Sequence, residues 1–168
     1  MKPKVSIIMG STSDLPVMEK AARVLNDFRV PFEMHALSAH RTPAEVEQFA
    51  READARGVEV IIAGAGMAAH LPGVIAALTP LPVIGVPINA SLGGIDALLA
   101  IAQMPPGIPV AATAVNGAMN AGILAAQILG CADEALREQV RAFKESLKEK
   151  IVEANKELGT VAYPYKTN

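Results

Sequence analysis

The sequence predicts an α/β protein built on a three-layer, doubly wound parallel sheet. Five apolar segments alternate with five segments of helical periodicity, and the connections between them are short. Two of the apolar segments, at 58–63 and 83–86, show no alternation of polar and apolar residues, which is typical of strands covered by helices on both faces. Ligands of such sheets bind at the carboxyl ends of the strands, so a site is expected in the loops at those ends.

The first two strand–helix units are delimited by their turns. A strand at 4–9 is followed by a Gly-Ser-Thr-Ser-Asp turn, and a helix is expected at 15–29. A second strand at 31–37 leads to a helix that starts at Thr42 and stops at Gly57. Thr42, with proline one residue later and glutamate three residues later, fits a capping box, which predicts that its side chain caps this helix.

The remaining elements continue the alternation toward a flavodoxin-like strand order. After the strand at 58–63, a segment rich in glycine and alanine leads into an apolar helix that ends near Leu78. The later predicted elements are a strand at 83–86, a helix at 95–104, a strand at 108–112 and a helix at 118–129. No repeat, low-complexity tract or linker interrupts the chain, so residues 1–168 are expected to form a single domain.

The last long segment, at about 133–158, predicts a C-terminal amphipathic helix. Its apolar residues recur at spacings of three and four, at Leu136, Val140, Phe143, Leu147, Ile151, Ala154 and Leu158. By contrast, the helices expected at 68–78 and 118–129 carry almost no charge on any side, which a monomer of this size could hardly cover. A homo-oligomer is therefore expected.

The composition narrows the class of protein. A net charge of −2 and a pI near 5.9 do not provide the basic surface that duplex nucleic acid requires. No apolar run reaches the roughly 20 residues of a membrane-spanning helix, and no charged-then-apolar leader opens the chain. The single Cys131 excludes an internal disulfide. We therefore expect a cytoplasmic protein without a nucleic-acid or membrane partner.

A first polar motif, Gly10-Ser11-Thr12-Ser13-Asp14, follows the first predicted strand. Its hydroxyls and carboxylate stand at a helix N-terminus, where free N–H groups and the helix dipole attract anions. Ser11 and Asp14 could therefore hold a phosphate and a ribose. Alternatively, Ser13 or Asp14 merely caps the helix, as these residue types often do.

A second motif, Ser38-Ala39-His40-Arg41, follows the second predicted strand. Arginine can bind a phosphate with two hydrogen bonds, and histidine is the side chain best matched to moving a proton at neutral pH. Ser38 adds a neutral donor beside them. The alternative is an Arg41 exposed to water and a His40 that only bonds backbone.

The segment Gly64–His70 has the Gly-x-Gly-x-x-Ala form of a dinucleotide-binding loop, but we reject that function. The acidic residue expected about 20 residues further on is missing, since 83–90 contains no Asp or Glu, and the loop follows the third strand rather than the first. The segment is interpreted as a small-residue loop that lets backbone approach a ligand. His70 is either a second polar contact or the residue that starts a helix, and His35, within a strand, is interpreted as structural.

No cofactor or metal is expected from the sequence. The Cys and His spacings do not fit a zinc site, and the few acids at strand ends do not fit a magnesium cluster. Flavin would normally need aromatic flanks, yet Tyr163 and Tyr165 lie away from the strand-end loops. A phosphoacceptor domain would need an aspartate where Gly64 stands.

Taken together, these motifs resemble those of the N5-carboxyaminoimidazole ribonucleotide mutase family. The motifs that carry the resemblance are Met9–Asp14, Ser38–Pro43, Gly64–Gly73 and Gln103–Pro105, within about residues 4–130. The resemblance implies a flavodoxin-like subunit, an octamer and active sites shared between subunits. In two places the chain departs from the family: Met67 stands where glycine is usual, and the loop 87–94 is one residue shorter.

The resemblance also implies roles for individual residues. The substrate-binding positions fall on Ser11, Asp14, Ser38, Arg41, Gly66 and Leu71. His40 matches the family's essential histidine, and His70 matches a second histidine that faces the transferred carboxylate.

The implied reaction belongs to de novo purine biosynthesis and is an isomerisation. Carbon dioxide leaves the exocyclic carbamate of the substrate, carbon 4 of the imidazole captures it, and His40 moves the proton as general acid/base. A closed pocket over 64–73 is expected to retain the gas and exclude water. One rival is direct carboxylation of aminoimidazole ribonucleotide by free carbon dioxide, whose enzymes resemble Ser-Ala-His-Lys in the second motif. Another is a non-catalytic nucleotide-binding module.

Overall fold

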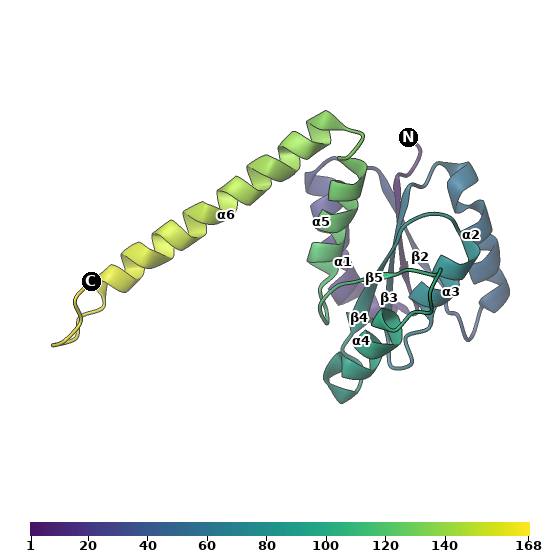
Figure 1. Cartoon of the computed structure of the whole chain (residues 1–168), viewed down its shortest axis with the longest axis horizontal. Coiled ribbons are helices and arrows are strands. Elements are labelled where there is room, and N and C mark those ends of the chain that lie inside the picture. The colour runs from purple at the N-terminus through teal and green to yellow at the C-terminus, as the bar shows by residue number, and fades with distance from the viewer.

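The computed structural model describes residues 1–168 and contains one five-stranded parallel sheet (Figure 1). The strands are β1 (Val5–Met9), β2 (Phe32–Ala36), β3 (Val60–Gly66), β4 (Val83–Ile88) and β5 (Ala111–Ala112). They lie in the order β2-β1-β3-β4-β5, and every neighbouring pair is parallel. This is the doubly wound, flavodoxin-like order that the sequence predicts.

Helices cover both faces of the sheet and make the three predicted layers (Figure 1). The α-helices are α1 (Leu15–Asp27), α2 (Pro43–Arg56), α3 (Leu71–Leu78), α4 (Ile95–Ala102), α5 (Ala118–Leu129) and α6 (Glu134–Thr160). Two 3-10 turns, η1 (Thr12–Asp14) and η2 (Leu92–Gly94), precede α1 and α4. One buried cluster joins the sheet to α1 and α5, and a second joins its other face to α2, α3 and α4.

The helices lie close to the sheet because the strands carry glycine at the positions where a helix side chain packs against them. Gly64, at the end of the pairing between β1 and β3, is one such position. A β-carbon there would overlap the thioether of Met18 on α1. On the opposite face, a β-carbon on Gly85 would overlap Ile101 on α4. These contacts fix the depth at which both helices pack.

Three local predictions differ from the structure. β3 continues through Gly66, so the expected glycine-rich loop is shorter than predicted. β5 has only two residues instead of five, since Pro109 has no N–H group to donate to a strand ladder. α2 begins at Pro43 as predicted, but the Thr42 side chain does not cap it: its Oγ1 accepts from the Ser38 N–H at 2.9 Å and donates to the Ser38 carbonyl at 3.1 Å.

The C-terminal helix α6 is present and begins as predicted. The Asp133 carboxylate caps it by accepting from the Leu136 N–H at 3.0 Å. Leu136 and Val140 are buried against the domain, and the Phe143 ring meets Phe28 edge-on at 5.6 Å between centroids. The first three members of the predicted apolar stripe therefore pack on their own subunit.

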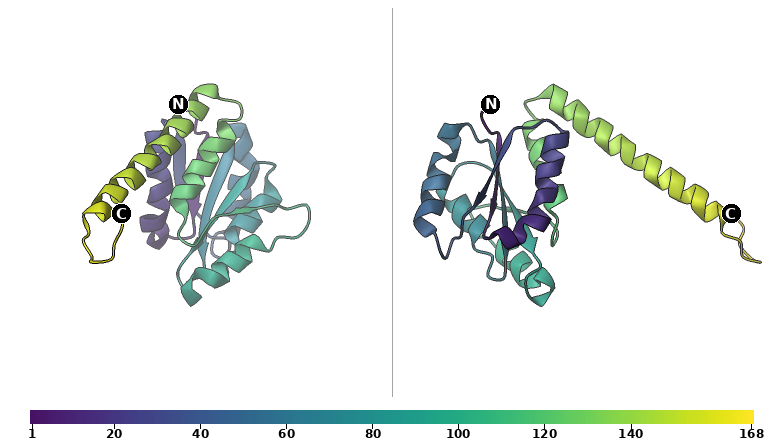
Figure 2. Two further views of the ribbon diagram at one scale, coloured as in Figure 1. Left: turned by 60° about the vertical axis from the view of Figure 1, so that its left-hand side comes forward. Right: turned by 180° about the vertical axis from the view of Figure 1, so that it is seen from behind.

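The remainder of α6 leaves the domain (Figure 1 and the right-hand view of Figure 2). The helix has 27 residues and is therefore roughly 40 Å long. Leu147, Ile151 and Leu158 continue the stripe but are exposed, the last two by 65% and 58%. Half of an amphipathic helix thus has no partner within the chain. None of the helices combines the length and the hydropathy that crossing a membrane requires.

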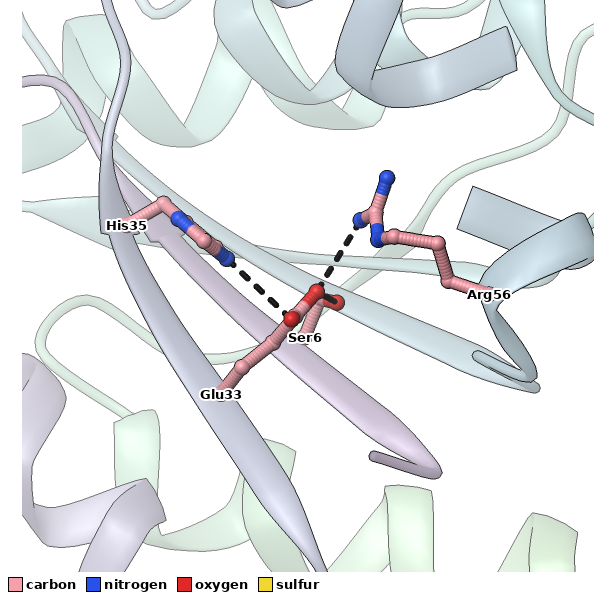
Figure 3. Close-up of polar contacts among 4 residues, drawn as sticks. All are labelled: Ser6, Glu33, His35 and Arg56. Carbon is pink, nitrogen blue, oxygen red and sulfur yellow. Dashed lines mark hydrogen bonds and ion pairs between the residues drawn. The ribbon is translucent and has the colours of Figure 1, made fainter. Parts of the chain in front are cut away.

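A polar cluster at the sheet edge joins Glu33 and His35 of the edge strand β2 to Ser6 of β1 and Arg56 of α2 (Figure 3). The Glu33 carboxylate accepts from the buried Ser6 hydroxyl at 2.6 Å and from Arg56 at 3.0 Å, and His35 Nε2 lies 3.3 Å from its other oxygen. Burial alone would raise the pKa of Glu33, but these hydrogen bonds together hold the pKa below its ordinary value. Arg56 also lies over the Phe49 ring at 4.8 Å. His35 thus belongs to a network at the sheet edge.

Candidate active site

A cavity of about 490 Å³ opens at the carboxyl ends of β1 to β4, where doubly wound sheets bind ligands. It is formed by the loops that follow these four strands. All eight residues predicted for the site line it: Ser11, Asp14, Ser38, His40, Arg41, Gly66, His70 and Leu71. The structure therefore brings three motifs that are distant in the sequence into one site.

The β1–α1 loop presents a carboxylate that is not used for helix capping. The Ser11 hydroxyl caps the turn η1 by accepting from the Ser13 N–H at 3.3 Å. The Asp14 side chain makes no capping bond to α1 and accepts a long bond from the Ser13 hydroxyl, at 3.4 Å. The capping alternative for Ser13 and Asp14 is therefore wrong.

Asp14 is electrostatically prepared to accept a hydrogen bond. Burial raises the pKa of its carboxyl above the ordinary value, and the bonds from Ser13 and Ser11 and the charge of Arg41 offset this only in part. A ligand hydroxyl that donates to the carboxylate would replace the lost hydration. A ribose provides such hydroxyls.

Arg41 is anchored between two of the loops. One Nη2–H donates to the Gly10 carbonyl at 2.8 Å, and Nε–H points to the Ser38 hydroxyl at 3.4 Å. The Ser38 hydroxyl also accepts from the Arg41 backbone N–H at 3.2 Å, while Thr42 braces Ser38 from the other side. Of the five guanidinium N–H groups, these bonds use two, so three remain for an anion in the cavity.

The two predicted histidines are in direct contact. His40 Nε2 lies 2.7 Å from His70 Nδ1, and the rings meet edge-to-face with centroids 4.9 Å apart. One nitrogen must donate and the other accept, so this contact holds a single proton on the line between the rings. His70 precedes α3 but makes no side-chain capping bond to it. His70 stands at the N-cap position of α3 and also makes a polar contact with His40, so the structure shows both a helix-start residue and a polar group facing the cavity.

The β3–α3 loop forms a wall of small residues, but the cavity is not closed. A β-carbon on Gly66 would lie 2.8 Å from the β-carbon of Ala90, so only glycine fits between the two loops. Gly64 is buried in the sheet and Gly73 lies within α3, and neither lines the cavity. His40, Met67 and His70 are exposed. The predicted closed pocket over 64–73 is therefore wrong for the single chain, in which the cavity is open to solvent.

Ala90 is a wall residue that the sequence analysis did not single out. It belongs to the loop after β4, which Asn116 holds in place: the Asn116 side chain accepts from the Asn89 N–H at 3.0 Å, and its backbone N–H donates to the Pro87 carbonyl at 2.8 Å. The sequence could have indicated Ala90 as a site residue, because its loop directly follows a predicted strand, at the edge where such sheets bind ligands. No group of three His, Cys, Asp or Glu side chains gathers where it could hold a metal ion.

Fold and cavity together define a flavodoxin-like protein with a cation, a carboxylate and a histidine pair at the carboxyl end of its sheet. Comparison with known families makes this more specific. Residues 4–150 match the AIR carboxylase family, and the chain belongs to that family.

Several relatives match almost the whole chain. The chain is 58% identical over 147 residues to the N5-carboxyaminoimidazole ribonucleotide mutase of Pyrococcus abyssi, which covers 87% of this chain and 84% of the relative. It is 52% identical over 162 residues to the mutase of Thermotoga maritima, covering 96% and 95%. The phosphoribosylaminoimidazole carboxylase of Saccharomyces cerevisiae is 51% identical over 164 residues, covering 97% of this chain but 29% of that protein.

Solved structures agree with the fold. A crystal structure of the S38D variant of Treponema denticola PurE2 superposes with a TM-score of 0.85 at 31% identity, covering 94% of this chain and 99% of the other. A structure of Treponema denticola PurE gives a TM-score of 0.79 at 29% identity, covering 93% and 98%.

Proposed function

We propose that this chain is an isomerase of de novo purine biosynthesis. It converts N5-carboxyaminoimidazole ribonucleotide into 4-carboxy-5-aminoimidazole ribonucleotide. The observation that carries the proposal is that relatives named for this mutase activity are 52% to 58% identical over most of the chain. The composition of the cavity is consistent with such a substrate, since it offers a cation for a phosphate and a carboxylate for a ribose.

The proposed chemistry moves a carboxylate from nitrogen to carbon. The carbamate C–N bond breaks, its electron pair stays on the exocyclic nitrogen, and that nitrogen takes up a proton as carbon dioxide is released. Carbon 4 of the imidazole then forms a C–C bond to the carbon dioxide and loses its proton, which restores the aromatic ring. One proton is taken up and one is released, so a single histidine can carry both transfers.

His40 is proposed as that proton carrier, and His70 as the residue that faces the transferred carboxylate. The contact between the two rings supports this assignment, because it holds one N–H proton and the lone pair that accepts it within the cavity. A bound imidazole must separate or rotate the two rings to reach the proton. The energy of their hydrogen bond is then exchanged for contacts with the substrate.

The other lining residues are proposed to bind the nucleotide. Arg41, with three unused N–H groups, and Ser38 hold the phosphate. Ser11 and Asp14 bind the ribose and phosphate side, where burial raises the pKa of the Asp14 carboxyl and a donating ligand hydroxyl would replace the lost hydration. Gly66 and Leu71 complete the wall beside the imidazole.

The assembled enzyme is proposed to be a cytoplasmic homo-octamer of single-domain subunits that needs no cofactor. The supporting observations are the exposed half of α6 and the open cavity, both of which a neighbouring subunit could cover. The octameric number comes from the family resemblance alone. Sedimentation of the purified chain measures it directly.

A second candidate is direct carboxylation of aminoimidazole ribonucleotide by free carbon dioxide. The name of the yeast relative favours it. Arg41 and the segment Ala68–Gly73 favour the mutase, because carboxylases of this fold resemble Ser-Ala-His-Lys in the second motif and lack the Ala-Ala-His-Leu-Pro-Gly segment.

Labelled bicarbonate separates the two activities. A reaction started from the unlabelled carbamate should incorporate little label into product at early times, whereas aminoimidazole ribonucleotide should react only at high bicarbonate. Efficient carboxylation at low bicarbonate, without preference for the carbamate, would assign the chain to the carboxylases. Binding of aminoimidazole ribonucleotide without turnover of either substrate would reduce it to a binding module.

A further inference from the structure

The connection between β3 and α3 has a backbone that suits glycine but carries methionine. Met67 has φ of +54°, in the left-handed region. The turn requires this conformation, since the Ala69 N–H bonds the Met67 carbonyl at 2.8 Å and the His70 N–H bonds the Ala68 carbonyl at 2.7 Å. An L-residue in this region is less stable than glycine, so the thioether side chain is present in spite of an unfavourable backbone. Strain of this kind clusters at functional sites.

The Met67 side chain is the one large exposed apolar group of the cavity. It is 59% exposed, whereas Leu71, the other large apolar residue of the lining, is only 3% exposed. The remaining apolar lining consists of alanines, such as Ala65, Ala68 and Ala90. A thioether on a flexible, unbranched stem can take many rotamers and adapt to what lies beneath it. Met67 therefore has the exposure and the side-chain freedom that a cover over the cavity needs.

The proposed reaction needs such a cover. Carbon dioxide exists free in the site between the breaking of the C–N bond and the formation of the C–C bond, and the cavity of the single chain is open at His40 and His70. An apolar group laid over the imidazole keeps the gas near carbon 4 and excludes water, which would otherwise hydrate it. A polar side chain in the same place would be less effective at excluding water, because it is itself hydrated.

We propose that Met67 closes over the reacting imidazole and determines how often carbon dioxide is recaptured rather than lost. The inference rests on the proposed mutase reaction. It assigns Met67 a role in fidelity rather than in proton transfer or phosphate binding. Met67→Ala should therefore increase escape of carbon dioxide.

Loss of carbon dioxide is measured by starting the reaction from unlabelled carbamate in ¹³C-bicarbonate at a concentration high enough to carboxylate the aminoimidazole ribonucleotide that is left behind. Carbonic anhydrase is present to mix the released gas into the labelled pool at once. Label in the product, corrected for loss without enzyme, counts the escaped molecules. Met67→Ala and Met67→Gly should raise it roughly tenfold, because both remove most of the covering apolar surface. Met67→Leu, which keeps apolar bulk, should stay near wild type. Met67→Gly should also melt at a higher temperature than Met67→Ala, since it relieves the left-handed strain.

Two results would overturn the proposal. One is labelling that does not rise in either small variant. The other is labelling that rises only in variants that no longer sediment like wild type, which would make Met67 a subunit contact. A wild-type enzyme that forms no product from the carbamate would instead refute the mutase function itself, so the two failures are distinguishable.

Discussion

Replacing His40 by asparagine should lower kcat by at least about 100-fold, the lower range for loss of a general acid/base. That factor corresponds to about 2.7 kcal/mol of transition-state stabilisation. Nucleotide affinity should change little, because Arg41, the proposed phosphate-binding group, is held by Ser38 and Gly10 and not by the imidazole. The 2.7 Å contact with His70 adds a sharper expectation: the two rings hold one proton between them and should act as one unit.

A double-mutant cycle measures that coupling. If His40 and His70 contributed independently, the losses of His40→Asn and His70→Asn would multiply in the double variant. If they act as a unit, the double variant should be no more than about threefold slower than the slower single variant. Single-turnover formation of the C4-carboxylated product, followed by ¹³C NMR of the labelled carboxylate, provides the rates. Multiplicative losses would refute the shared proton, and near-normal turnover of His40→Asn would remove His40 from the mechanism.

Three further predictions concern affinity, assembly and acid stability. Arg41→Ala should mainly weaken nucleotide affinity, by about 10- to 100-fold for loss of a charge-assisted contact, and an unchanged Kd would show that another group holds the phosphate. Ile151→Glu should dissociate the oligomer in sedimentation, because it places a charge in the exposed apolar stripe of α6 that we expect a neighbouring subunit to cover. Ser146→Glu, about 140° around the helix, is the control and should not dissociate it. A wild-type sedimentation pattern for Ile151→Glu would contradict subunit contact through this stripe. Glu33→Gln should lower the free energy of unfolding by about 1–3 kcal/mol at pH 7. The folded-state pKa of Glu33 is lowered, so its contribution is present above the unfolded pKa and is lost as pH falls through the folded value; denaturation curves should converge in acid, and a constant difference would reject the argument.

Sequence patterns were sufficient where a residue's environment is set by its own neighbours in the chain. α5 occupies 118–129 as predicted, since glycines flank a mostly apolar helix that carries no charged residue. These patterns gave a wrong prediction where a group outside the local pattern bonds the side chain instead. The Thr42 hydroxyl had two choices, the helix end or Ser38, and only the folded loop selects Ser38.

The candidate site was predictable as a set of loops but not as a set of contacts. The rule that parallel strands point their carboxyl ends to one edge brings Ser11, His40 and His70 together without any knowledge of distances. The bond between the two histidines joins loops 30 residues apart, and nothing in either motif encodes it. The openness of the cavity likewise depends on how far each loop extends.

The free half of α6 has a consequence for local stability within the subunit. Beyond Leu147 the helix has no tertiary contact and is supported by ion pairs such as Lys148–Glu145 and Lys156–Glu153. About four turns of helix in water are only marginally stable on their own. Amide hydrogens there should therefore exchange within seconds in dilute subunits, while those near Val140 stay protected. On assembly the protection should spread toward the C-terminus, so that hydrogen exchange along one helix reports how much of the protein is assembled.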